Sequence, residues 1–230
     1  MDLPLALTTN SLRVTSLRQY IFNEILKSIF TGEFEAGTRL KIQYLAKRYG
    51  VSSTPLREAI IDLCGVGFAQ FSLNRGAVVS AFGPQQIRDI YQVRRILEVE
   101  SVHCACDCRN LKDIEEVYTE TINLQVADRD ENWFRRCTEI DKKTHLTIVN
   151  AAGNSHLKHE IIRYERLMNT INLIMEQDKH YEDFLSEHLE ILEAMIHCDQ
   201  KSAGEAMSNH INAAGKRTVE WISSLVEFQQ

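Results

Sequence analysis

The chain has 230 residues, of which 44% are hydrophobic and 25% are charged, as in an ordinary globular protein of one or two domains. No stretch approaches the roughly 18 consecutive apolar residues of a membrane span. The N-terminus MDLPLALTTN lacks the basic start of a secretory signal. We therefore expect a cytoplasmic protein without a membrane partner. The net charge of −6 argues, taken alone, against a nucleic-acid-binding protein.

The charge, however, is unevenly distributed along the chain. Residues 11–80 contain nine Lys or Arg and five Asp or Glu, a net charge of +4, so that the remaining residues carry −10. A basic segment joined to an acidic one predicts one nucleic-acid-binding face and a second function elsewhere. Six cysteines include Cys104, Cys106 and Cys108 in HCACDCRN. This segment reads as a helix, on which positions i and i+2 face different sides, so we interpret them as reduced thiols, not metal ligands.

The first eighty residues predict three helices followed by a hairpin. Apolar positions with helical spacing indicate a helix over 16–31, with Ser16 as its N-cap, and GEFEAGTRL follows as a connecting loop. IQYLAKRYG is a second, short helix with Gly50 at its C-cap. After the turn VSST, a third helix covers about 54–66. Two β-prone runs, 68–73 and 77–80, flank the turn Asn74-Arg75-Gly76. This order is that of a winged helix-turn-helix domain, but a small helical domain without a DNA role could share it.

Phe82-Gly83-Pro84 interrupts the pattern and marks a linker. Beyond it the sequence predicts helices over 85–108, 111–128, 131–152, 155–179, 182–199 and 201–226. The fold class is therefore mainly α, with a winged helix-turn-helix domain over 11–81 and an all-α helical bundle over 85–228.

Around the turn VSST the sequence resembles the GntR family of bacterial regulators. The resemblance rests on GEFEAGTRL, LAKRYGVSSTPLREAI and NRGAVV, which follow the family pattern over about 60 residues. It implies a homodimer that binds double-stranded operator DNA with an inverted repeat. The family usually has Arg where this chain has Ser53, and losing that guanidinium removes a potential guanine contact. The DNA-binding residues we expect are Arg39, Lys47, Arg48, Ser52, Ser53, Thr54, Arg57, Arg75 and Gly76.

The C-terminal helices resemble the FCD-type ligand-binding domain of the FadR subfamily. DKKTH places Asp141 and His145 one helical turn apart, and His188 and His210 follow on apolar helix faces. One carboxylate and three imidazoles suit a divalent metal, with Zn²⁺ first and Ni²⁺ or Mn²⁺ as alternatives. A histidine on an apolar face is otherwise a hydrogen-bonded core residue. The separations of the four residues match those of metal-binding relatives, so the resemblance implies that they are the ligands.

YQVRRILEVE matches the first helix of the same domain, in which an arginine of relatives holds an acidic ligand. The resemblance implies that Arg94 binds the carboxylate of a small organic-acid effector. The alternative is that Arg94 pairs with Glu98 on the helix surface.

We therefore expect a transcription regulator controlled by an acid bound near a metal. One alternative is a regulator for which the metal itself is the signal. Another is a metal-dependent hydrolase, against which we note that no general base is matched to the metal. Glu187 precedes His188, but adjacent helix residues do not face one site.

Overall fold

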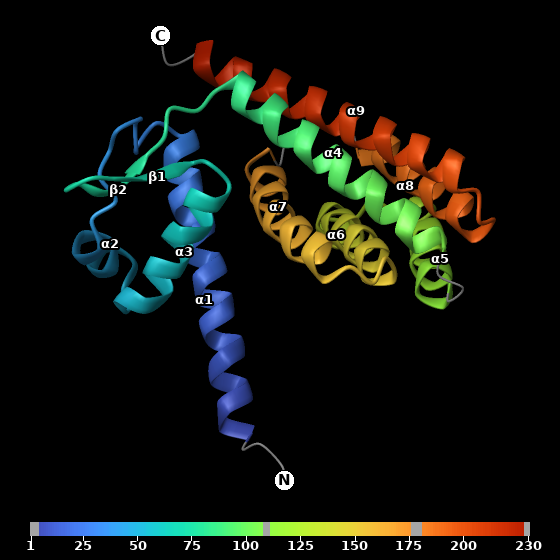
Figure 1. The fold of residues 1–230 in the computed structure, drawn as a ribbon, viewed down its shortest axis with the longest axis horizontal. Helices are drawn as coiled ribbons and strands as arrows, with labels where there is room; N and C mark the ends of the chain where they lie inside the picture. The colour runs from blue at the N-terminus through green and yellow to red at the C-terminus, as the bar shows by residue number, and fades with distance from the viewer. Residues whose placement is uncertain (1–4, 108–110, 176–180, 228–230) are drawn as a thin grey trace. The chain divides into compact units, whose positions relative to one another are not determined.

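The computed structural model describes residues 5–107, 111–175 and 181–227. It divides into two compact units, the first up to Gly83 and the second Pro84–Ser224 (Figure 1). No described helix combines the length and apolar character that a membrane span requires. The predicted mainly helical fold class is confirmed, since a two-stranded sheet in the first unit is the one sheet among the described residues.

The first unit has the element order of a winged helix-turn-helix domain, as predicted. Its elements are α1 (Leu5–Phe30), α2 (Ile42–Tyr49), α3 (Ser53–Gly65), β1 (Ala69–Ser72) and β2 (Gly76–Val79). Gly50 ends α2 in the left-handed conformation, with φ of 65°, which glycine adopts at little cost. The expectation that the first helix begins at Ser16 is wrong, because α1 extends back to Leu5. The chain has no Pro or Gly between Leu5 and Thr31, so nothing in the sequence stops the helix at the edge of its apolar stripe.

The core of the first unit lies between α1 and α3. Ile21, Ile25 and Leu26 of α1 are almost fully buried, and side chains of this size each stabilise the fold by about 1.5–3 kcal/mol when removed from water. At the surface, Arg18 Nε donates to Asp62 Oδ2 over 2.6 Å, which ties α1 to α3. This packing holds α3 in place as a rigid, outward-facing helix.

The sheet is a hairpin with an additional edge that the sequence did not predict. β1 and β2 pair antiparallel, with Ala69 opposite Val79. The turn contains Asn74 and Gly76, whose φ angles of 62° and 73° explain why Asn and Gly stand there. The end of the segment interpreted as a loop also pairs with β2, since the Leu40 amide donates to the Ala77 carbonyl over 2.9 Å. Arg39 is thereby fixed against the hairpin.

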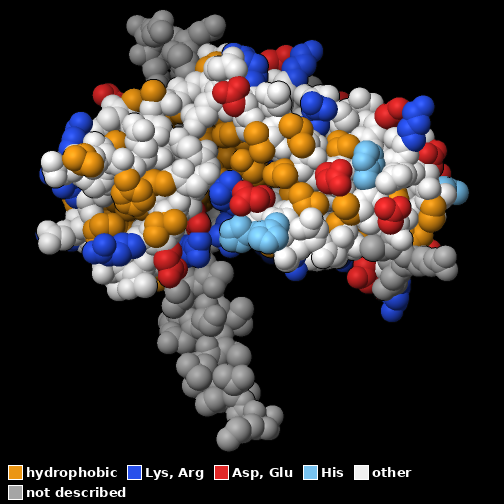
Figure 2. All heavy atoms as spheres, in the orientation of Figure 1, with side chains coloured by type: hydrophobic (Ala, Val, Ile, Leu, Met, Phe, Trp, Pro, Cys, Tyr) orange, Lys and Arg blue, Asp and Glu red, His pale blue; other side chains and the backbone are white. Residues whose placement is uncertain are grey.

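The second unit consists of six helices among the described residues: α4 (Pro84–Cys106), α5 (Lys112–Gln125), α6 (Trp133–Ala151), α7 (Ser155–Ile174), α8 (Tyr181–Ile196) and α9 (Gln200–Glu227). The six predicted helices are present, and where a predicted end falls on described residues it differs from the observed end by at most three residues. The predicted ends at 108 and 179 lie outside the described residues. In the view of Figure 2, acidic and basic side chains of this unit are interspersed with hydrophobic ones.

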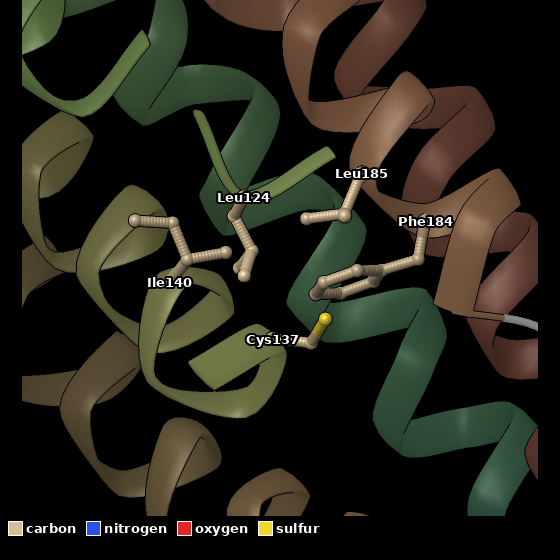
Figure 3. Packing of buried hydrophobic residues seen from close by; sticks show 5 residues of the cluster. All are labelled: Leu124, Cys137, Ile140, Phe184 and Leu185. Atoms are coloured by element: carbon tan, nitrogen blue, oxygen red, sulfur yellow. The ribbon is translucent and has the colours of Figure 1, made fainter. Parts of the chain in front are cut away.

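One apolar cluster holds α5, α6 and α8 together. Figure 3 shows its buried members, which are Leu124, Cys137, Ile140, Phe184 and Leu185. Ile140 immediately precedes Asp141 on α6, and Leu185 lies one turn before His188 on α8. The cluster therefore fixes the spacing of the two helices that carry three of the predicted metal ligands.

Candidate metal centre and DNA-reading surface

The four predicted metal ligands come together inside the second unit. Asp141 and His145 project from α6, His188 from α8 and His210 from α9, and all four are buried. One ligand atom of each lies within 4.8 Å of the corresponding atoms of the others. Asp141 Oδ1 is 3.4 Å from His145 Nε2 and 3.4 Å from His188 Nε2. His145 Nε2 and His210 Nε2 are 3.3 Å apart.

His188 differs from its neighbours in having no hydrogen bond at either ring nitrogen. Its exposed fraction is 0%, so water does not compensate. A buried polar group without a partner costs about 1–3 kcal/mol, and structures rarely leave one in place without a reason. Burial, together with His210 and His145, holds the pKa of His188 well below its usual value. The imidazole is therefore neutral, which is the form that binds metals.

Two glutamates hold the outer nitrogens of the other two histidines. His145 Nδ1 contacts Glu98, and His210 Nδ1 lies 2.7 Å from Glu187 Oε2. Such carboxylates fix the orientation of the ring, so that Nε2 faces the metal. Neither role could be predicted from the sequence. Glu187 and His188 are adjacent on α8 and do not face one site, but Glu187 reaches His210 of α9.

The electrostatics of the cluster favour a cation. Burial alone would lower the pKa of His145, but Glu98 and Glu165 outweigh it and raise the pKa to about 10. Burial likewise opposes ionisation of Glu98, yet His145 and Arg94 lower its pKa to about 2. Three imidazole nitrogens and one carboxylate oxygen at this spacing suit a divalent transition metal such as Zn²⁺. The residues present fit such an ion.

A cavity of about 70 Å³ adjoins two of the four predicted ligands, Asp141 and His210. Its wall is made of Tyr91, Arg94, Asp141, Met168, Asn172, Met175, Phe184, His210, Ala214, Arg217 and Thr218. A cavity of about 10–15 Å³ is enough to hold one water molecule, so this larger space admits a small ligand. Tyr91 is held by a hydrogen bond of 2.9 Å between its hydroxyl and that of Thr218. The cavity thus connects the metal site with α4 and α9.

Arg94 lines this cavity and pairs with Glu98, but the pair is buried and not on the helix surface, where the alternative expectation placed it. It is buried, with Nε 2.7 Å from Glu98 Oε1 and Nη2 donating to Glu165 Oε1 over 2.8 Å. Glu98 therefore joins Arg94 to His145. Glu165 was not foreseen, because its helix, α7, is brought to α4 by packing alone. Burial raises the pKa of Glu165 to about 7, although Arg94 acts to lower it.

All nine predicted DNA-binding residues are exposed on the first unit. Five of them line one hollow, together with Lys41 and Phe71: Arg39, Ser53, Arg57, Arg75 and Gly76. Lys47, Arg48, Ser52 and Thr54 lie outside it. The charge of Arg48 is already met by Glu33, since its Nη2 donates to Glu33 Oε2 over 2.9 Å. The positive charge of the hollow that α3 and the hairpin border comes from Arg39, Lys41, Arg57 and Arg75.

The cysteines form no alternative metal site among the described residues. Cys104 and Cys106 are half-buried on α4 and form no disulfide with a described residue, and Cys108 lies outside the part of the chain that the structure describes. Burial raises the pKa of the Cys106 thiol to about 11, so it is protonated and a poor ligand at neutral pH. The interpretation of these residues as reduced thiols agrees with this environment.

A winged helix-turn-helix domain joined to a helical domain, which holds a buried Asp/His cluster beside a cavity, is the architecture of a DNA-binding transcription regulator. Comparison with known families supports this class. Residues 17–79 match the family described as bacterial regulatory proteins, gntR family, and residues 89–213 match the FCD domain. The chain belongs to the GntR family, in its FCD-containing, FadR-like branch. Its relatives are transcription regulators, so it is not an enzyme.

Individual relatives are distant but cover most of the chain. An uncharacterized HTH-type transcriptional regulator, YdhC, of Bacillus subtilis is 25% identical over 212 residues, which cover 90% of this chain and 91% of YdhC. The gluconate operon transcriptional repressor of the same organism is 28% identical, over 70% of this chain and 67% of its own. The structure of Escherichia coli McbR/YncC matches with a TM-score of 0.62 and 19% identity over 93% of this chain and 99% of that one, which supports the fold.

Proposed function

We propose that this regulator binds a divalent metal through Asp141, His145, His188 and His210, and that Zn²⁺ is the ion. The observation that carries the proposal is the buried His188 ring, which has no hydrogen bond and lies within 4.8 Å of three other ligand atoms. An ion at this point would satisfy the ring and balance the nearby carboxylates. Ni²⁺ or Mn²⁺ would suit the same donors.

We further propose that a small organic acid binds in the adjoining cavity and controls operator affinity. Asp141 and His210 line this cavity, so an ion held by the four residues would border it, and a carboxylate oxygen could join its coordination as a fifth ligand. Arg94 lines the same space. The cavity favours an organic ligand over the alternative in which the metal itself is the signal, because a metal sensor needs no such space. Acid binding would shift the population between conformations with different DNA affinity.

We propose that the exposed residues of the first unit bind the operator DNA. The N-terminal end of α3 carries Ser53, Thr54 and Arg57, all exposed, and would enter the major groove. The protein would act on DNA in the cytoplasm. Arg39, Lys47, Arg48 and Ser52 would contact phosphates or base edges near it, and Arg75 with Gly76 would place the wing against the backbone. A homodimer would present two readers, and its operator would be an inverted repeat.

Metal binding is tested by elemental analysis of the purified protein. We expect one Zn²⁺ per chain in the wild type and in His197→Ala, which removes an exposed histidine directly after α8. We expect none in the double variant His188→Ala/His210→Ala. If the double variant retained one ion per chain, the ligand set would be wrong. Selection of random-sequence DNA by the wild type then tests the reader, since a sequence without two-fold symmetry would contradict the proposed dimer.

A further inference from the structure

We infer that the effector is a monocarboxylate with an uncharged, largely apolar remainder, and not a dicarboxylate. The inference rests on the proposed function, namely that an acid binds at the metal, and it concerns the far end of that acid. Two observations carry it: the arginines of the cavity wall are already paired with glutamates, and the rest of the wall is largely apolar.

Arg94 cannot act as an unpaired receptor for a second carboxylate. Its guanidinium is bordered by Glu98 Oε1 at 2.7 Å and by Glu165 Oε1 at 2.8 Å. Both glutamates are buried, so water does not weaken their interaction with the arginine. One positive charge therefore already faces two carboxyl groups. A further carboxylate at this place would compete with both glutamates for the arginine and would be repelled by the ionised Glu98.

The other arginine of the wall is also paired. Arg217 Nη1 and Nη2 donate to Glu187 over 3.2 and 3.3 Å, and Glu187 in turn holds His210. Breaking this pair to bind an acid would disturb the ring of a metal ligand. Among the described residues of the cavity wall, Arg94 and Arg217 are the only Lys or Arg side chains. The far end of the effector thus meets no free positive charge there.

The remaining wall is suited to an apolar chain. Met168, Met175, Phe184 and Ala214 line it, and methionines adapt readily to the shape of an aliphatic group. Burying a carboxylate among them without a partner would be strongly unfavourable, whereas burying a methyl or methylene group is favourable. Arg94 and Asn172 could still donate hydrogen bonds to a neutral oxygen. As far as the described residues show, the metal is then the only strong site for a carboxylate.

Pentanoate and glutarate test this directly, because both have five carbons and glutarate differs by a second carboxylate. Isothermal titration calorimetry of the Zn²⁺-loaded full-length protein should show pentanoate binding at least about tenfold more tightly, a difference of about 1.4 kcal/mol. Removing the metal with a chelator should abolish binding of pentanoate. In Glu165→Gln, which removes one of the two carboxyl groups beside Arg94, the preference for pentanoate over glutarate should fall at least about threefold, or about 0.65 kcal/mol. The control Glu160→Gln, on the outer side of the same helix, should retain it.

The outcomes separate the two proposals. If glutarate bound the wild type as tightly as pentanoate, or more tightly, this inference would be wrong while acid binding at the metal would stand. If neither acid bound the metal-loaded protein, the proposed function would be contradicted and this inference with it. An unchanged preference in a folded, metal-loaded Glu165→Gln would refute the role given to Glu165.

Discussion

Metal binding should selectively stabilise the second unit against heat. Asp141, His145, His188 and His210 come from three different helices, so an ion that binds them ties α6, α8 and α9 together only in the folded state. The unfolded chain presents the same residues far apart and binds the ion weakly. A ligand that binds the native state alone shifts the unfolding equilibrium in proportion to the logarithm of its concentration.

The size of the effect follows from mass action. With free Zn²⁺ at 100 times its dissociation constant, the gain is about 2.7 kcal/mol. For a domain of roughly 150 residues, each kcal/mol raises Tm by about 2–4 °C, so a rise of about 5–11 °C is expected. The relief of the unpaired His188 ring is already contained in the binding constant and adds nothing separately.

The two tryptophans, Trp133 and Trp221, allow the second unit to be observed alone, since both belong to it. Thermal unfolding followed by tryptophan fluorescence should show the rise on adding Zn²⁺ to chelator-treated protein. His197→Ala should show the same rise and His188→Ala/His210→Ala should show none, whatever their starting Tm. An equal rise in the double variant, or no rise in the wild type at saturating Zn²⁺, would refute the reasoning.

Two further comparisons test packing and DNA recognition. Gly215→Ala should destabilise the second unit by about 1–3 kcal/mol, because its Cβ would lie 3.0–3.1 Å from the buried Tyr91 ring. Gly204→Ala should cost less than about 1 kcal/mol, since it meets only the half-exposed His103 and gains helix propensity. Denaturant unfolding measures both, and equal losses would contradict this. Arg57→Ala should weaken binding to selected DNA by about 1–3 kcal/mol in mobility-shift titrations, and more than Arg48→Ala, whose charge Glu33 already meets.

Much of the fold could be predicted from the sequence because the signals are local. Gly50, Asn74 and Gly76 stand at backbone conformations that few other residues tolerate, so they mark a helix end and a hairpin turn. The sequence does not predict the extension of α1 back to Leu5, because its amphipathic spacing is recognisable only from about Ser16 onward, whereas the helix begins at Leu5. The pairing of Leu40 with Ala77 was missed because a single strand edge leaves no periodic pattern.

The predicted metal ligands could be found from the sequence, whereas the residues that orient them could not. Asp141 and His145 are one helical turn apart, and the resemblance supplied the other two histidines. The partners that orient them come from separate helices and carry no motif. Glu98 on α4 holds His145, while Glu187 on α8 holds His210, a residue of α9. Only the packed bundle brings these side chains together.

The three predicted histidine ligands cannot be told apart in the sequence, but in the structure they differ in what holds each ring in place. His145 and His210 have a carboxylate on the outer nitrogen, which fixes the ring and strengthens it as a metal ligand. His188 has none, and it is positioned instead by burial and by the Phe184 ring, whose centre lies 4.3 Å from its own. Phe184 also lines the cavity. A ligand that displaces Phe184 would therefore move His188 before it moved the other two, which makes this ring the most direct link between an occupied cavity and the metal.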